Sequence, residues 1–453
     1  MRAFTLFSIL IFAAGSASAQ SDTGAAPTDI AALRDELAQL RDEVAALRAA
    51  LGEIRNSIGA NGRPLRDRQQ PSLQAAQVTP ETIDMLKTQI AEQAQAKVES
   101  SSRLPVKVSG TILANTFVNT GEANWIDNPN LVGLPPSGGR PEGSTSATAR
   151  QSRIGFETSG IAIGSWQASG TIIADFFGGV PGFQTGTVMG LPRLLYGFGR
   201  LQTDRTAIEV GQDHMILAPR DPTSLAALSF PLLFRAGNLY LRAPQARVEQ
   251  KLGSDWTVEG GILAPIAGDT ANTYDFAPPP GAGERSKRPA FQGRVGFARG
   301  DKDSEREFAA GVSGHYGWRR PATTLVDAWA VAVDFNARVS RIAAAGEFFW
   351  ADNAEPFGGG ISQPGRASGG WAEARLRVTP RTMVTTGFGM DRPKDALGRE
   401  LRSENRSAFG SVIFDITPEV ATSLEYRWLE TRLGMLPTSR ENHHVNAVLA
   451  VRF

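Results

Sequence analysis

The stretch that decides the fold reads VKVSGTILAN, residues 106–115, in which small or apolar residues alternate with polar ones. The same period of two recurs in WAVAVDFNAR, residues 329–338, where Trp329, Val331 and Val333 share one face. Alternation over about ten residues is typical of a membrane strand, which has lipid on one side and a water-filled lumen on the other. We therefore predict an all-β transmembrane barrel over residues 105–453.

Turn signals divide this region into about sixteen segments, an even number, as antiparallel single-chain barrels have. The connections alternate between long ones rich in Pro, Gly and Ser, such as residues 120–149, and tight ones such as Gly160-Ile161. Long outer loops and short periplasmic turns are the pattern of outer-membrane barrels, and only the short outer loop 319–323 departs from it. The predicted strands begin near residues 106, 150, 163, 190, 205, 236, 255, 289, 306, 324, 340, 369, 380, 404, 419 and 441.

The last predicted strand ends on an aromatic residue. Its apolar face consists of Val445, Ala447, Leu449, Val451 and Phe453. A terminal aromatic on such a strand resembles the signal read by the barrel assembly machinery, and we assign this role to Phe453. Further aromatic residues near strand ends are expected in girdles at the two membrane interfaces: Trp318, Trp350, Trp371, Tyr426 and Trp428.

Residues 1–19 have the pattern of a secretory signal peptide. Arg2 supplies a positive start, residues 4–14 form an apolar core, and residues 17–19 read Ala-Ser-Ala, a typical cleavage site. The alternative, a retained anchor, needs a longer apolar core than this one. Together with the barrel pattern, the signal predicts the cell outer membrane.

A heptad pattern follows in residues 20–58. Apolar residues recur there at alternating spacings of three and four, which indicates an α-helical coiled coil. One helix cannot bury such a seam alone, so we expect an oligomerisation segment in the periplasm; the alternative is an amphipathic helix lying on its own domain. Residues 59–104 read as a linker and a second, weaker helix. The predicted seam is Ile30, Leu33, Leu37, Leu40, Val44, Leu47, Leu51 and Ile54.

The composition excludes several functional classes. The 453-residue chain has no Cys, and its net charge of +1 argues against nucleic-acid binding. It contains neither an H-E-x-x-H nor a G-x-S-x-G motif, so we expect no enzymatic activity, no metal and no cofactor. The alternate acidic residues of the stretch 301–305 could bind Ca²⁺, but a charged turn is the simpler interpretation.

Arginine dominates the basic residues, with 40 Arg against 7 Lys. If apolar positions such as Ile154 and Phe156 face lipid, their charged neighbours face the lumen. We expect Arg on one wall and carboxylates on another, a field that favours anions because the guanidinium fork binds both carboxylate oxygens. The alternative is that Arg and Glu pair with one another and stiffen the wall. The inward candidates are Arg153, Glu157, Glu209, Arg247, Glu249, Gln292, Arg294, Arg338, Glu373, Arg375 and Arg377.

The third outer loop, residues 218–235, is too apolar for a solvated loop, since it contains the run LAALSFPLLF at 225–234. Two interpretations stay open. The loop folds into the lumen as a constriction, with Arg220, Asp221 and Arg235 at its ends, or it packs at a subunit interface.

Four features of the sequence resemble the DcaP-like family of outer-membrane porins. They are the heptads after the signal peptide, the first strand VKVSGTI (106–112), the segment ARQSRIGFE (149–157) and the stretch IEVGQ (208–212). The resemblance implies a trimeric barrel of sixteen strands that takes part in dicarboxylate uptake. One departure lies at residues 213–215, Asp-His-Met, where the family leads us to expect an aromatic residue.

The sequence therefore predicts a porin for the passive diffusion of small hydrophilic solutes, with a preference for anions such as dicarboxylates. The alternative is a structural barrel that tethers the outer membrane to the cell wall through its coiled coil. The expected partners are the lipid bilayer and its lipopolysaccharide, the barrel assembly machinery, two further copies of the chain, small anions and, in the alternative, peptidoglycan. No nucleic-acid partner is expected.

Overall fold

A computed structural model of the chain describes residues 106–133, 142–179, 188, 190–265, 280–300, 306–394, 401–434 and 439–453. The signal peptide, the heptads, the linker with its second helix, and the acidic stretch 301–305 lie outside the described residues. What the sequence indicates for these segments stays a prediction. Among the described residues, no helix has the length and hydropathy needed to cross a bilayer.

The described residues form seventeen strands and three short helices. The strands are β1 (Val106–Asn119), β2 (Ser144–Thr148), β3 (Arg153–Ile163), β4 (Trp166–Asp175), β5 (Arg193–Gln202), β6 (Thr206–His214), β7 (Arg242–Leu252), β8 (Trp256–Leu263), β9 (Ala290–Arg299), β10 (Arg306–Arg319), β11 (Val326–Val339), β12 (Ile342–Asp352), β13 (Arg366–Thr379), β14 (Thr382–Pro393), β15 (Arg402–Asp415), β16 (Val420–Leu433) and β17 (Ser439–Arg452). The helices are α3 (Ala282–Arg285), η1 (Glu355–Phe357) and η2 (Gly360–Ser362).

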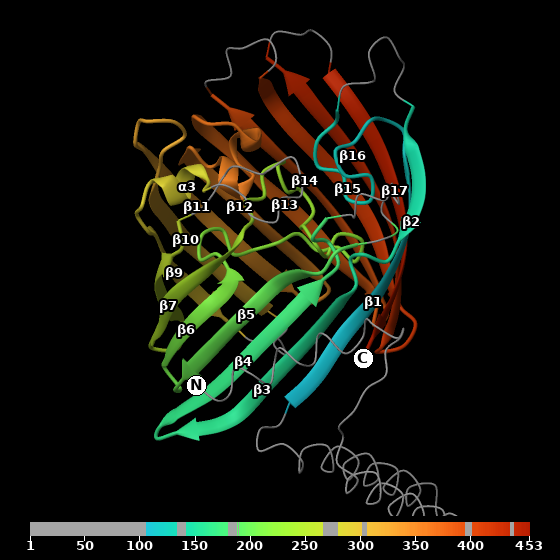
Figure 1. The fold of residues 1–453 in the computed structure, drawn as a ribbon. Helices are drawn as coiled ribbons and strands as arrows, with labels where there is room; N and C mark the ends of the chain where they lie inside the picture. Colours follow the sequence, from blue (N-terminus) through green and yellow to red (C-terminus); the bar gives the residue numbers. More distant parts are fainter. Residues whose placement is uncertain are drawn as a thin grey trace, which may run out of the picture. The chain divides into compact units, whose positions relative to one another are not determined.

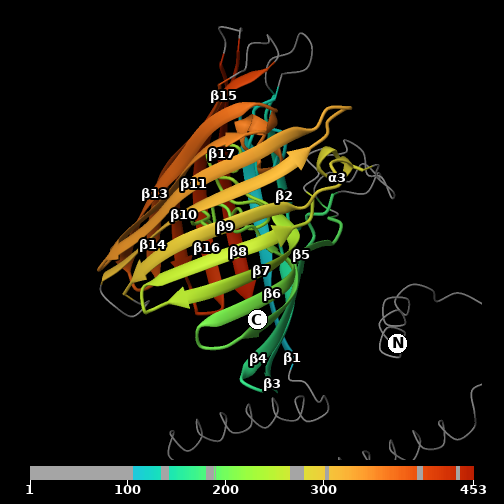
Figure 2. The same ribbon diagram turned by 90° about the vertical axis from the view of Figure 1, so that its left-hand side faces the viewer.

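Every strand pairs antiparallel with its neighbours, and the sheet closes where β17 pairs with β1. Strands β2 and β3 lie one after the other along the same edge of β1, opposite residues 115–119 and 106–111 respectively. The two count as one barrel strand, so the described part of the chain makes a closed barrel of sixteen. The predicted number is confirmed, and Figures 1 and 2 show the strands running obliquely around the barrel.

The connections alternate in length as expected. Tight turns join β3 to β4, β7 to β8 and β13 to β14 at one end of the barrel, while long segments join β4 to β5, β6 to β7 and β8 to β9 at the other. Gly253 in the turn after β7 has a φ of +73°, a left-handed conformation that glycine adopts without strain. The end with the long loops is called the loop end below.

Side chains alternate between a polar inner face and an apolar outer face. On β1, Val108 and Ile112 are 51% and 55% exposed, whereas Asn115 is 1% exposed because it faces inward. The last strand follows the same rule, with Leu449 and Phe453 exposed on its outer face. The predicted alternation is confirmed, and it leaves an outer surface suited to lipid.

Trp371 is an exception to the expected aromatic girdle. Trp350 and Tyr426 are exposed on the outer face, but Trp371 is buried inside the barrel, where its indole N–H donates to Glu347 at 3.2 Å. The prediction for Trp371 was wrong because the period of two places it on the same face as Glu373 and Arg375, which point inward.

Candidate functional site

The connection between β6 and β7, residues 215–241, folds into the barrel; we call it the lumen loop. Leu217, Leu232 and Leu239 of this loop are at most 1% exposed. Figure 1 shows the loop as green coil surrounded by strands. The loop folds into the lumen, as the first of the two interpretations predicted, and its burial there accounts for the apolar run.

Inward polar side chains of the wall bind the backbone of the first part of the loop. Gln292 on β9 accepts hydrogen bonds from the backbone N–H groups of Ile216 and Leu217, at 2.8 and 3.0 Å. Glu347 on β12 accepts from the N–H of Arg220 at 2.7 Å. A loop without regular structure can be buried only if such groups replace water as partners of its backbone.

The tip of the loop is bound on the opposite side of the barrel. Ser224 donates from its hydroxyl to Glu425 on β16 at 2.6 Å. Gln151, just before β3, accepts from the N–H of Leu228 at 3.0 Å and donates to the carbonyl of Ala226, also at 3.0 Å. The loop thus crosses the lumen from β9 to β3, and its many wall contacts hold it as a fixed constriction.

Several residues of the loop have strained backbones. Ala218, Leu233 and Arg235 have φ values of +49°, +63° and +65°, in the region that favours glycine. Gly237 has a φ of +99°, and a Cβ there would lie 2.0 Å from the carbonyl oxygen of Gly370 on β13. Strained residues persist only where their surroundings over-determine them, and they are common at functional sites.

Some predicted lumen residues form ion pairs that join the loop to the wall. Asp334 on β11 pairs with Arg220 of the loop at 2.6 Å and with Arg294 on β9 at 2.9 Å. Glu373 accepts two hydrogen bonds from Thr223 of the loop, at 2.7 and 2.9 Å. These groups act as structural anchors of the constriction.

Other predicted residues pair with neighbours on the same wall. Arg247 on β7 binds Glu209 at 2.9 Å and also Asp213, both on β6. Glu209 and Glu249 are further bound by Arg200 on β5, at 3.2 and 2.9 Å. On the other wall, Arg338 pairs with Glu307 at 3.3 Å, and Arg375 donates to Asn336 at 2.6 Å.

The expected separation of arginines and carboxylates onto opposite walls was wrong. Inward residues on adjacent antiparallel strands stand directly opposite each other, as Glu209 and Arg247 do. A buried charge is costly unless a partner neutralises it, so the alternating charges pair across strands. The alternative expectation, that Arg and Glu pair and stiffen the wall, describes most of the set.

Two predicted residues lie away from the constriction. Arg377 stands near the tight-turn end of β13, where its guanidinium donates to the carbonyl of Pro380 at 3.2 Å. Glu157 on β3 lies opposite Lys107 of β1, on the same face as Arg153.

Four arginines near the lumen loop lack the carboxylate partners that the anchoring residues have. Within the described residues, no carboxylate lies within ion-pair distance of them; they are Arg153, Arg235, Arg242 and Arg402. Arg153 donates instead to the carbonyl of Leu228, and Arg402 to that of Ile361 at 3.3 Å. These four side chains give the lumen a local excess of positive charge.

Arg153 lies near two further arginines. Arg242 and Arg193 both repel its guanidinium electrostatically, while Asp175, which pairs with Arg193 at 2.7 Å, attracts it. Arg242 donates to the hydroxyl of Tyr196 at 3.1 Å. Of these three arginines, on β3, β5 and the start of β7, only Arg193 forms an ion pair with Asp175.

The other two arginines without carboxylate partners, Arg235 and Arg402, lie close enough to repel each other. Arg235 donates to Asn130 at 3.2 Å and stands over the rings of Phe234 and Trp125, 5.4 and 5.7 Å from their centroids. Burial, and to a lesser degree the charge of Arg402, lowers the pKa of Arg235 to about 10, so it stays charged at neutral pH.

The sequence predicted Arg153 and Arg235 but missed Arg242 and Arg402. The period of two places Arg242 on the same face of β7 as Val248, and Val248 is exposed on the outer surface of the barrel. Only the structure shows the Arg242 guanidinium 4.8 Å from the ring centroid of Tyr240 in the lumen loop. No sequence signal marks this contact, because it depends on the path of the loop.

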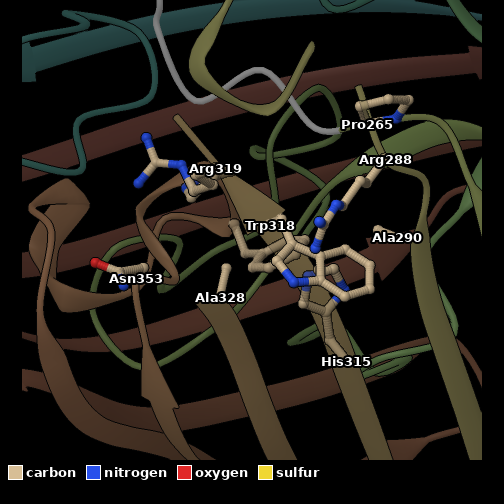
Figure 3. A pocket seen from close by; sticks show the side chains of 11 residues that line it. Pro265, Arg288, Ala290, His315, Trp318, Arg319, Ala328 and Asn353 are labelled. Carbon is tan, nitrogen blue, oxygen red and sulfur yellow. The ribbon is translucent and has the colours of Figure 1, made fainter. Parts of the chain in front are cut away.

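A small cavity lies near the loop end of β9, β10 and β11 (Figure 3). His315 and Trp318 of β10 line it together with Arg288, whose guanidinium lies 4.9 Å from the Trp318 ring centroid. Its volume is about 10 Å³, enough for one water molecule. The cavity is therefore no solute site.

No family model and no curated protein matches the chain, but several solved structures do. The outer-membrane channel DcaP of Acinetobacter baumannii matches with a TM-score of 0.60 and 15% identity, over 78% of this chain and 99% of that one. This chain has the fold of an outer-membrane porin. The expected resemblance to DcaP-like porins is confirmed at the level of the fold.

Two further porins have the same fold. An anion-selective porin from Comamonas acidovorans matches with a TM-score of 0.51 and 13% identity, over 78% of this chain and all of that one (100%). OmpF of Salmonella typhi, solved with daunomycin, matches with a TM-score of 0.50 and 10% identity, over 77% and 98% of the two chains.

Proposed function

We propose that this protein is an outer-membrane porin through which small hydrophilic solutes diffuse passively, with a preference for anions such as dicarboxylates. The closed barrel, its apolar outer face and its polar lumen support a pore, and the likeness to solved porins supports the same function. The lumen loop sets the width of the passage. No bond is made or broken in this function, so selectivity depends on charge and size alone.

The observation that carries the anion preference is the set of four arginines without carboxylate partners. An Arg fork can bind a carboxylate through two parallel hydrogen bonds, and its charge is permanent at neutral pH. Arg153 and Arg242 lie close enough to repel each other, so a solute with two carboxylates would relieve that repulsion. Binding must stay weak for solute to leave, and the backbone and tyrosine contacts that these arginines already make favour weak binding.

Conductance in a planar bilayer tests the pore directly. We expect stepwise current increases on insertion, and a concentration-dependent reduction by succinate that exceeds the reduction by acetate at equal ionic strength. Folded protein, verified by heat-modifiable gel mobility, that inserts without conducting would contradict the porin function. Equal reductions of conductance by succinate and by acetate would contradict the dicarboxylate preference and would leave a pore without that preference.

The heptads, which lie outside the described part of the chain, and the C-terminal Phe453 carry further proposals. The seam Ile30 to Ile54 would assemble three copies through a periplasmic coiled coil, and Phe453 would direct the barrel to its assembly machinery. The heptads also favour the second candidate function, a tether between the outer membrane and peptidoglycan. Deletion of residues 20–103 separates the two: a tether predicts intact permeability with a weakened envelope, whereas a porin predicts an intact envelope.

A further inference from the structure

Charged side chains gather on the outer face of the barrel, where lipid is expected. They lie near the loop end of three adjacent strands, β14, β15 and β16. Their positions share the face of Phe388, Val412 and Leu424, which are exposed apolar residues. We call this set the rim cluster: Arg392, Glu404, Arg406, Glu430 and Arg432.

The rim cluster is one connected network. Arg392 donates from Nε to Glu404 at 2.5 Å, and Arg432 donates from Nε to Glu430 at 2.8 Å. Arg406 lies between them, bonded to Glu430 and 3.7 Å from Glu404. Three arginines thus share two glutamates, and a third carboxylate, Glu441 on β17, lies opposite Glu430 and attracts Arg432.

The charges of the cluster are layered. The carboxylate side chains of Glu404 and Glu430 are only 9% and 1% exposed. The side chains of Arg392, Arg406 and Arg432 are 56%, 30% and 44% exposed. Glu404 and Glu430 therefore lie underneath and hold the arginines in place, while the three guanidinium groups reach the surface, where the exposed Glu441 lies beside Arg432 only.

The position of the cluster along the strands matches the edge of a membrane. Arginine on the lipid face costs about 2–4 kcal/mol at the bilayer midplane but about 0–1 kcal/mol near the interface. Trp350 is exposed and lies in register with Arg392 across Ser368 of β13, and Arg406 lies 5.3 Å from the ring centroid of Trp428. Exposed aromatic residues of this kind mark the headgroup region.

An apolar groove leads away from Arg392 along the outer face. Its volume is about 410 Å³, and Phe348 and Trp350 of β12 line it opposite Phe388 and Met390 of β14. The intervening strand β13 contributes the small residues Gly370 and Ala372. A Cβ on Gly370 would lie 2.4 Å from the Phe348 ring. The groove can have its present depth here only because residue 370 has no side chain.

We propose that the rim cluster and the groove together bind one phosphorylated lipid of the surrounding leaflet, of the lipid A class. Its phosphate would contact Arg392, Arg406 and Arg432, and one acyl chain would occupy the groove. The three exposed guanidinium groups favour an anionic headgroup, and the groove beginning at Arg392 favours a molecule with an acyl chain attached to that headgroup. The proposal rests on the membrane location of the proposed porin but not on its conductance.

The test is binding of lipid A to the purified full-length protein in a neutral detergent, measured by native mass spectrometry. The probes are lipid A, the same lipid after enzymatic dephosphorylation, and inorganic pyrophosphate. We expect lipid A to bind, and the double variant Arg392→Gln/Arg432→Gln to bind it about tenfold more weakly. Ala372→Leu, which fills the groove and keeps the arginines, should also weaken binding. Arg381→Gln, at the opposite end of β13 and β14, is the matched control.

Each alternative has its own outcome. Equal binding of dephosphorylated lipid, or unchanged binding by the double variant, would overturn the phosphate site. Binding of pyrophosphate as tight as that of lipid A would reduce the site to an adventitious ion site without a lipid. A change of oligomeric state in the double variant would show that the face is a subunit interface. Heat-modifiable mobility verifies that every variant is folded, and conductance of the same samples reports separately on the porin function.

Discussion

Thr223 of the lumen loop donates two hydrogen bonds to the Glu373 carboxylate on β13, one from its backbone N–H at 2.7 Å and one from its hydroxyl at 2.9 Å. The contact joins residues 150 positions apart in the sequence. The same type of contact recurs along the lumen loop. Carboxylates and amides on the inner face of the wall accept hydrogen bonds from loop N–H and hydroxyl groups, which in an exposed loop would bind water.

Thr223→Val removes the hydroxyl and keeps the shape of the side chain. Glu373 is 4% exposed, so a lost donor costs about 1–3 kcal/mol at this contact. We expect a looser loop, seen as greater open-channel current noise and more frequent closures. Thr223→Ser keeps the hydroxyl and is the control. Current noise in Thr223→Val equal to that of the wild type would show that this contact does not hold the loop.

Gly237→Ala tests the close approach of the loop to β13. Its Cβ would meet the Gly370 carbonyl at 2.0 Å, so the loop must move away from the wall. We expect a lower melting temperature and an altered single-channel conductance. Gly253→Ala is the matched control, since Gly253 also has positive φ but no atom lies within 4 Å of its added Cβ. It should cost about 1–2 kcal/mol of stability without changing conductance. Unchanged conductance in Gly237→Ala would contradict the assignment of the loop as the constriction.

Asp334→Asn removes the carboxylate that Arg220 and Arg294 share. Asp334 is 4% exposed, and breaking such a buried pair costs about 3–5 kcal/mol. The variant adds one positive charge to the lumen, so its anion preference should rise while its melting temperature falls. The reversal potential and the melting temperature are measured on the same preparation. An unchanged reversal potential would mean that Asp334 lies outside the field that ions experience, and a shift toward cations would contradict the expected effect of its charge.

Salt should weaken the selectivity in a predictable way. The Debye length falls from about 10 Å at 0.1 M salt to about 3 Å at 1 M. A preference caused by fixed arginines in a wet lumen should therefore decline as both bath concentrations rise at a constant ratio. A preference that is constant over this range would indicate selection by size at the constriction instead of by charge.

Alternation along the chain was sufficient to predict the barrel. It fixes which face each residue presents, so strand positions, connection lengths and the count of sixteen followed from residues such as Val108, Asn115 and Leu449. Two starts were misplaced by about six residues: 150, against Ser144 of β2, and 236, against Arg242, because residues 236–241 belong to the lumen loop. Trp371 follows the same period and faces inward with Glu373, which is why its assignment to an outer girdle failed.

The site was less predictable, for a physical reason. The apolar run of residues 225–234 indicated burial, but its path depends on contacts with inward side chains from β1 to β16, which no local pattern encodes. Pairing also depends on strand register: Asp334 neutralises Arg294 because β9, β10 and β11 place the two side chains together. The arginines that stay unpaired, Arg242 among them, could be identified only after the pairs were known.

The most direct test of the account is the reversal potential of the wild type and of Arg153→Gln/Arg242→Gln in a planar bilayer under a salt gradient, with Arg381→Gln as the control. We expect the wild type and the control to prefer anions, and the double variant to lose most of that preference while it still conducts. A wild type that prefers cations, or a double variant with the wild-type potential, would contradict the claim that unpaired arginines beside the lumen loop set the selectivity of the pore.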